Sequence, residues 1–218
     1  MAVVMVLSLV IQRTLTARFE KYSRVPSPDN MTGAEVARRM LHDYGIVDVK
    51  VEHVSGKLTD HYNPQTKTLN LSDAVYAQSS IAAAAVAAHE CGHAVQHQFA
   101  YAPLRLRSAL VPVVSFASNW VQWVLLAGVI FINTFPNLIW IGIGMFALTT
   151  LFSFVTLPVE VNASQTAVEW LDRSGIVDAQ TKPMAKDALH WAAYTYVIAA
   201  IGSLATLLYY ISIANRRN

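Results

Sequence analysis

The chain has 218 residues, of which 54% are hydrophobic and only 14% are charged. Soluble domains average about 25% charged residues, and the mean hydropathy here is +0.37, so the composition indicates a membrane protein. The formal net charge of +2 is too small to suggest a nucleic-acid-binding surface. A single cysteine, Cys91, excludes an intramolecular disulfide.

The N-terminal stretch, residues 1–11, is apolar apart from Ser8 and is followed by several basic residues. A helix needs about 20 apolar residues to cross a bilayer. We therefore expect residues 1–12 to form a short membrane anchor. A secretory signal is disfavoured because the basic residues follow the apolar stretch instead of preceding it.

Residues 13–107 carry patterns of helices and strands outside the membrane. Thr32-Gly-Ala-Glu35 is a capping box, and it predicts a helix that continues to about Tyr44 and is closed by Gly45. The segments after Gly45 alternate in polarity and predict strands, two of which flank a polar turn as a β-hairpin. These predicted strands are residues 47–54, 58–62 and 68–71.

An alanine-rich segment, residues 81–98, contains the sequence His89-Glu90-Cys91-Gly92-His93. Alanine favours a helix, and residues four apart on a helix share one face about 6 Å apart. The imidazoles of His89 and His93 can therefore hold one metal ion. Glu90 lies beside that ion, where its carboxylate can accept a proton from metal-bound water. This H-E-x-x-H arrangement predicts a zinc hydrolase.

The alternative is that this helix carries histidine and glutamate by accident. It is disfavoured because two imidazoles and a carboxylate would be costly to bury unpaired in an otherwise apolar helix. Cys91 points away from the histidine face, and we expect it to be a small buried residue rather than a ligand.

No Asp, Glu, Lys or Arg occurs between Arg107 and Glu160. This stretch is long enough for two membrane spans, 111–132 and 138–157, and predicts a transmembrane hairpin over residues 108–157. A further uncharged run predicts a C-terminal transmembrane helix over residues 193–214.

Glu160 directly follows the predicted hairpin, in a helical region (158–192) with Pro158 in its first turn. Because two crossings return the chain to the side it left, Glu160 can reach the metal as the third ligand and leave the fourth position to water. Glu169 is half a turn out of phase with it, and His97 is about 12 Å along the axis from His89. No spacing argument places His190.

Five motifs, in order along the chain, together suggest a known family. They are Leu58-Thr-Asp60-His61-Tyr62 with the Lys67-Thr-Leu hairpin, Ala87-Ala-His89-Glu-Cys-Gly-His93-Ala-Val-Gln-His97, Tyr101-Ala-Pro-Leu-Arg-Leu-Arg-Ser108, Leu157-Pro-Val-Glu-Val-Asn-Ala-Ser164 and Thr195-Tyr-Val197. With these motifs the chain resembles the YugP-like neutral zinc metallopeptidases of bacterial membranes over nearly its whole length. The resemblance implies zinc, peptide-bond hydrolysis and Glu160 as a ligand. The wider group is similar to the HtpX and CAAX prenyl proteases, which carry Glu-x-x-x-Asp on the helix of the third ligand; here Ser164 takes the second position.

These observations predict a mainly α-helical integral membrane protein with a zincin-like helix and a small β-hairpin sheet. We expect a gluzincin-like metalloendopeptidase that binds one Zn²⁺ per chain and uses Glu90 as general base. Its partners would be a protein or peptide substrate and the lipid bilayer. The alternatives are a non-proteolytic metal-binding scaffold and a chaperone-like interaction protein.

Further residues are assigned supporting roles. We expect the strand preceding the metal-binding helix to be an edge strand that pairs with the substrate backbone. Four further residues could either hold a metal ligand in place or donate a hydrogen bond to the oxyanion of the reaction, and their spacing in the sequence does not show which does so. The edge-strand residues are Thr68, Leu69, Asn70 and Leu71, and the supporting candidates are His97, Ser164, His190 and Tyr196.

The basic residues predict the orientation in a bacterial cell membrane. All of them except Arg216 and Arg217 lie on the side of the predicted metal site, and the loop between the two hairpin spans carries none. Because cytoplasmic flanks of membrane helices are enriched in Lys and Arg, we expect the site to face the cytoplasm.

Overall fold

The computed structural model describes residues 2–215. Arg216 and Arg217, the two basic residues that the predicted orientation does not place on the side of the site, lie outside the described residues. The elements are, in chain order, α1 (Ala2–Ser23), α2 (Gly33–Asp43), β1 (Lys50–Val54), β2 (His61–Asn63), β3 (Thr68–Ser72), α3 (Ile81–Gln98), α4 (Ala102–Ile130), α5 (Asn137–Arg173) and α6 (Lys182–Asn215).

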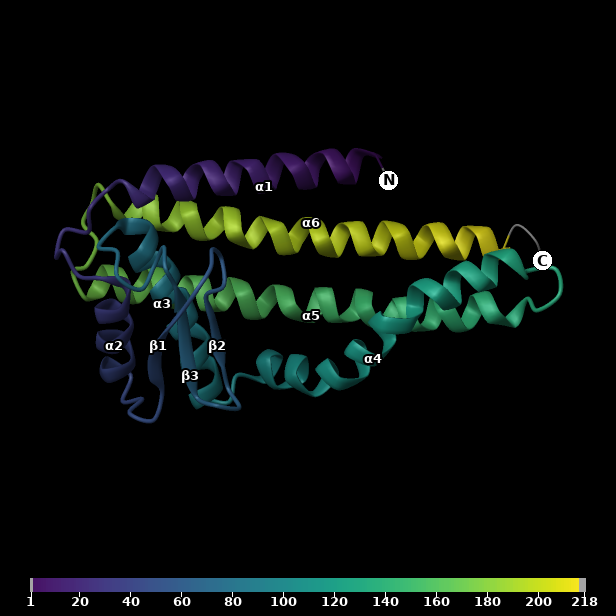
Figure 1. The fold of residues 1–218 in the computed structure, drawn as a ribbon, viewed down its shortest axis with the longest axis horizontal. Helices are drawn as coiled ribbons and strands as arrows, with labels where there is room; N and C mark the ends of the chain where they lie inside the picture. The colour runs from purple at the N-terminus through teal and green to yellow at the C-terminus, as the bar shows by residue number, and fades with distance from the viewer. Residues whose placement is uncertain (1, 216–218) are drawn as a thin grey trace.

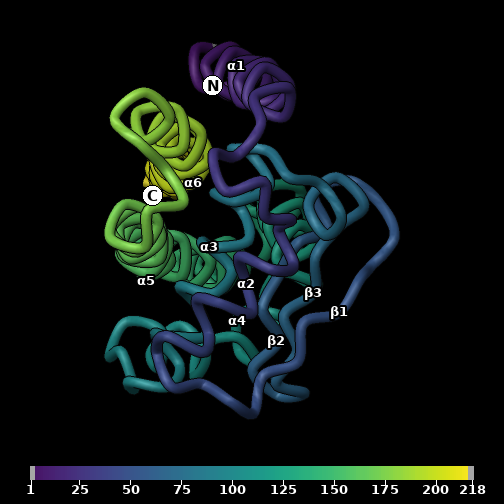
Figure 2. Tube along the Cα trace, turned by 90° about the vertical axis from the view of Figure 1, so that its left-hand side faces the viewer, coloured from purple at the N-terminus to yellow at the C-terminus, as the bar shows by residue number. Residues whose placement is uncertain are grey.

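The molecule is elongated and mostly helical (Figure 1). Helices α2 and α3 and the three strands gather at one end, and α4, α5 and α6 run from there along the long axis. Helix α1 lies beside α6. Viewed along that axis, α3 lies between α5 and the strands (Figure 2). The predicted fold class, mainly α with a small sheet, is confirmed.

Three helices within residues 2–215, namely α4, α5 and α6, are long and apolar enough to cross a membrane. Two of them form the predicted hairpin, in which the far half of α4 packs closely on α5. A Cβ on Gly128 of α4 would lie 2.7 Å from the Cα of Ile139, so only glycine permits this approach. The side chains of α4 that turn away from α5, such as Trp120 and Trp123, are exposed and suit contact with lipid.

Helix α5 is continuous from Asn137 to Arg173, so the prediction that a new helix starts at Pro158 is wrong. Proline is favoured in the first turn of a helix, and the sequence argument used it as a start signal. Membrane helices also tolerate internal proline where neighbouring groups satisfy the freed backbone. The second apolar segment of the hairpin and the segment with Glu160 therefore belong to one continuous helix.

Helix α1 extends well beyond the predicted anchor of residues 1–12, because it runs unbroken to Ser23. It is not one of the three helices that are long and apolar enough to cross a membrane. Its C-terminal half is tied to α6: the Tyr22 hydroxyl donates to Asp187 Oδ2 at 2.7 Å, and Arg18 Nη1 lies 3.3 Å from the same oxygen. This contact places α1 against the side of α6 near the sheet end.

Helix α2 begins with the predicted capping box. The Thr32 hydroxyl accepts from the Glu35 N–H, and Glu35 Oε2 accepts from the Thr32 N–H at 2.8 Å. Gly45 follows the helix at φ +69°, as the predicted closing position requires. The buried face of α2, with Val36 and Met40, packs against α3.

The sheet has the order β1-β3-β2, with β1 parallel and β2 antiparallel to β3. The predicted hairpin is confirmed, but the prediction that Thr68, Leu69, Asn70 and Leu71 form an edge strand is wrong. Hairpin patterns show which strands pair, but not on which side a third strand adds. Here β1 adds to β3, so β3 is the central strand, and its Leu69 and Leu71 are fully buried in the core. The edge strand that contacts α3 is β2.

The predicted first strand, residues 47–54, is shorter in the structure and begins at Lys50. Val47 is 89% exposed and lies before the pairing with β3 starts. Val47 continues the alternation of polar and apolar residues in the sequence, but no residue of β3 pairs with it.

Helix α3 begins at Ser80, whose hydroxyl accepts from the Ala83 N–H at 3.2 Å. Its alanines are almost all buried, because small side chains let neighbouring elements approach from several sides. Cys91 is fully buried, as expected, and burial raises the pKa of its thiol well above the usual value. Gly92 faces α5, where an added Cβ would lie 2.7 Å from the Ala163 carbonyl oxygen. The H-E-x-x-H segment thus touches the backbone of α5.

Candidate metal centre

Three side chains from two helices converge at the contact between α3 and α5. His89 Nε2 and His93 Nε2 lie 3.3 Å and 3.6 Å from Glu160 Oε2. One ligand atom from each residue lies within 4.8 Å of the other two, so the group can hold a metal ion. The two imidazole centroids are 4.9 Å apart, as expected for positions four apart on one helix.

The opposite nitrogens of both imidazoles are held by other side chains. His89 Nδ1 is 3.1 Å from the Ser164 hydroxyl, and His93 Nδ1 is 3.1 Å from Gln96 Oε1. Metal-binding histidines usually have such a partner, which fixes the ring orientation. Both Nε2 atoms therefore face Glu160.

Glu160 suits the role of a metal ligand because its Oε2 atom is not engaged by another group. Its side chain is only 4% exposed, and within the described residues Oε2 has no hydrogen-bond partner. A buried carboxylate oxygen without a partner is costly. Burial alone would lower the pKa of His93, but the neighbouring carboxylates of Glu160 and Glu90 raise it overall. These carboxylates favour positive charge at the point where the three donor atoms meet.

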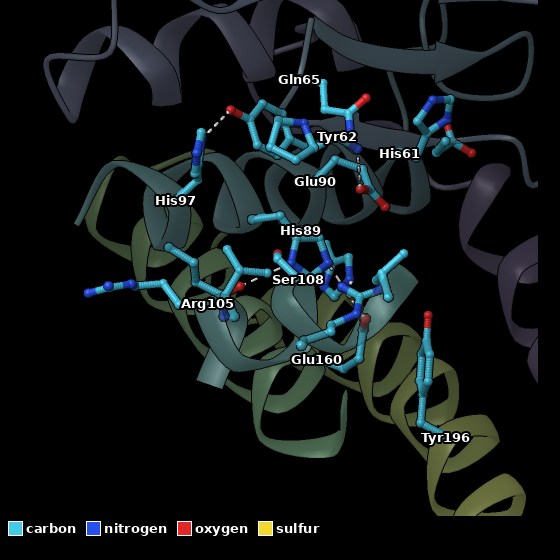
Figure 3. Close-up of a pocket in the computed structure, with 17 residues that line it drawn as sticks. His61, Tyr62, Gln65, His89, Glu90, His97, Arg105, Ser108, Glu160 and Tyr196 are labelled. Atoms are coloured by element: carbon cyan, nitrogen blue, oxygen red, sulfur yellow. Dashed lines mark hydrogen bonds and ion pairs between the residues drawn. The ribbon is translucent and has the colours of Figure 1, made fainter. Parts of the chain in front are cut away.

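Glu90 lies next to this cluster on the side of the sheet (Figure 3). Its Oε2 accepts a hydrogen bond from the Tyr62 N–H of β2 at 3.2 Å. That N–H is directed at α3 and not at β3, so the backbone of the edge strand reaches the site. The Tyr62 hydroxyl lies 2.9 Å from His97 Nδ1, which places His97 beside β2 and away from the three donor atoms.

The cluster opens into a cavity of about 710 Å³ between β2, α3 and α4. Of the four predicted supporting residues, His97 and Tyr196 line this cavity, while Ser164 contacts His89 behind it. His190 lies elsewhere, in a separate recess with Gln165 and Glu169. Glu169, weighed as a rival ligand, is likewise outside the cluster.

Two residues at the site were not singled out from the sequence. The Gln96 side chain, besides facing His93, donates to the Val159 carbonyl and to Asn162 Oδ1, both at 2.8 Å, and so ties α3 to α5 beside Glu160. Arg107 Nη1 lies 3.8 Å from Glu160 Oε1, the oxygen that does not face the histidines. In the sequence, Arg107 is only a basic residue that flanks a predicted membrane span.

Comparison with known proteins agrees with this geometry. A family model described as "Putative neutral zinc metallopeptidase" matches residues 1–215. This chain belongs to that family. The metallopeptidase-family chain is also 43% identical, over 207 residues, to the protein named "Putative membrane protease YugP" of Bacillus subtilis (strain 168). The alignment covers 95% of this chain and 91% of the relative. No solved structure matches the chain.

Proposed function

We propose that this member of the zinc metallopeptidase family is a membrane-embedded metalloendopeptidase that binds one zinc ion through His89, His93 and Glu160. The observation that carries the proposal is the unpartnered Oε2 of buried Glu160, which faces two oriented imidazole nitrogens. When bound there, zinc would polarise a substrate carbonyl and acidify a water molecule.

The roles of the chain's own groups follow from their positions. Glu90 is beside the three donor atoms without being one of them, so it acts as the general base toward the attacking water. It then returns the proton to the leaving amine. Arg107 neutralises the outer oxygen of Glu160 and keeps Oε2 directed at the histidines. Tyr196, whose side chain lines the cavity beside Glu160, is the oxyanion donor that we favour over His97 and His190.

The substrate backbone would pair with β2, which replaces residues 68–71 in this role. Strand β2 is one of the two edge strands of the sheet, and it borders both the cavity and α3. An extended peptide can add to such an edge by main-chain hydrogen bonds. The peptide would then lie between β2 and the histidines, within reach of Glu90.

The proposed function is tested by an assay of the purified protein in detergent. Cleavage of casein or of a denatured membrane protein should stop after treatment with a zinc chelator and return when zinc is added. Mass spectrometry of the products should show internal cuts. Zinc binding without any cleavage would contradict the proposal and favour a metal-binding scaffold.

Glu160→Ala should weaken zinc binding by more than about 100-fold, because loss of even an outer-shell partner commonly costs 10- to 100-fold. The measurement is zinc content after dialysis, together with a competition titration against a chelator of known affinity. Glu169→Ala is the matched control: the same residue type on the same helix, but exposed and outside the cluster. Equal zinc affinity in the two variants would remove Glu160 from the ligand set.

We further propose that the site faces the cytoplasm. A cysteine at Lys57, in the exposed loop before β2, should resist an impermeant thiol reagent in intact cells, and a cysteine at Thr134, between α4 and α5, should react. Both substitutions are made in a Cys91→Ala background, and labelling of lysed cells shows that both thiols can react. The reverse pattern in intact cells would place the site outside.

A further inference from the structure

The metal cluster borders a second, smaller recess in addition to the large cavity. This recess has a volume of about 240 Å³ and lies between α1, α3 and α6. His89, Glu90 and Glu160 line both spaces. A group seated in the recess would therefore lie directly beside the bond that the site would hydrolyse.

The walls of the recess are different in character from those of the large cavity. Beyond the residues that the two spaces share, the recess is lined by apolar side chains together with Ser164 and Thr195. The large cavity carries Arg105, Arg107 and His97 on its walls. The apolar walls include Leu15 and Phe19 of α1, Val86 of α3, and Ala188, Leu189 and Ala192 of α6.

Leu58 also lines the recess. It lies in the loop between β1 and β2, it is 64% exposed, and its φ of +57° is unusual for leucine. An exposed leucine beside an apolar recess can bury its side chain against an apolar group that enters the recess. An apolar group of the substrate would cover it.

We propose that this recess is a specificity subsite for one large apolar side chain next to the scissile bond. The inference rests on the proposed function, and it adds the substrate class: peptides with leucine, phenylalanine or a similar residue at one fixed position. Its volume is below the roughly 300–1,000 Å³ of pockets that enclose whole small molecules, so it suits a single side chain. The remaining peptide would lie in the larger cavity along β2.

The expected selectivity follows from the area that such a side chain removes from water. Full burial of a leucine or phenylalanine side chain favours binding by about 10- to 100-fold over alanine. Ala192 is the most suitable position for filling the recess, since it lines the recess only and is already partly covered. Ala199, on the same helix, is exposed and lies outside the recess, and so provides the matched control.

The experiment uses polar decapeptides that differ only in one central residue, which is alanine, leucine or phenylalanine. Binding is measured with the zinc-loaded full-length Glu90→Gln protein in detergent, and cleavage with the parent protein. We expect the leucine and phenylalanine peptides to bind about 10- to 100-fold more tightly than the alanine peptide. Mass spectrometry should place the cut at a bond adjoining the variable residue.

Ala192→Leu should remove most of this preference, and Ala199→Leu should preserve it. Leu58→Ala, at an exposed position that the fold does not depend on, should lower the preference without affecting stability. Equal binding of the three peptides, or equal behaviour of Ala192→Leu and Ala199→Leu, would overturn the subsite. A binding preference without any cleavage by the parent protein would leave the subsite intact and contradict the proposed function.

Discussion

Replacing Glu90 with glutamine should lower kcat/KM for peptide cleavage by about 100- to 10,000-fold, the usual contribution of a general base. The zinc content should stay at one per chain, because Glu90 is not among the three clustered donor residues. Glutamine keeps a side-chain oxygen that can accept the Tyr62 N–H, so the position of β2 should also be preserved. What is lost is the capacity to take a proton from water.

The measurements are steady-state cleavage of a fluorogenic peptide and metal analysis of the same preparation. Glu169→Gln provides the control for the chemical change, because Glu169 lies outside the cluster and the large cavity. Cleavage by Glu90→Gln at the parent rate would exclude Glu90 as the base, even if zinc remained essential.

Replacing Gly92 with alanine should reduce both zinc affinity and stability. Its added Cβ would lie 2.7 Å from the Ala163 carbonyl oxygen and 3.0 Å from the Ala163 Cα. These are backbone atoms of α5, so no side chain can rotate to relieve the overlap, and α3 must move away from α5. Overpacking of this kind costs about 1–3 kcal/mol. The same movement separates His89 and His93 from Glu160.

Gly144→Ala is the control, because Gly144 lies within α5, the helix that Gly92 contacts, and its Cβ would meet nothing within 4 Å. Thermal unfolding in detergent and a zinc competition titration should distinguish the two variants. If Gly92→Ala bound zinc and unfolded like the Gly144→Ala protein, the close contact of α3 with α5 would not be what assembles the site.

The sequence could predict the elements whose signals are local. The capping box at Thr32 and the uncharged runs each depend on neighbouring residues alone, and the structure has both the box and the long apolar helices. The two histidines on one helix face follow from helix geometry alone. Glu160 required only the additional argument that a hairpin returns the chain to its starting side.

The features that could not be predicted depend on contacts between distant segments. The parallel pairing of β1 with β3 makes β3 central, and no local pattern in residues 68–71 distinguishes a central strand from an edge strand. Arg107 and Gln96 reach the site because α4 and α5 pass beside α3. The residues around Pro158 do not show whether the proline starts a helix or lies inside one whose backbone is satisfied by neighbouring elements.

Because α5 holds both a stretch apolar enough to cross a membrane and Glu160, the order of synthesis limits when the cluster can exist. A ribosome completes His89 and His93 well before it reaches Glu160, and the two long apolar segments lie between them in the chain. The nascent protein therefore has only two of the three clustered residues until α4 and most of α5 have been synthesised. If α4 and α5 cross the membrane and the cluster holds zinc, as proposed, no fragment that ends before the second crossing can hydrolyse a peptide.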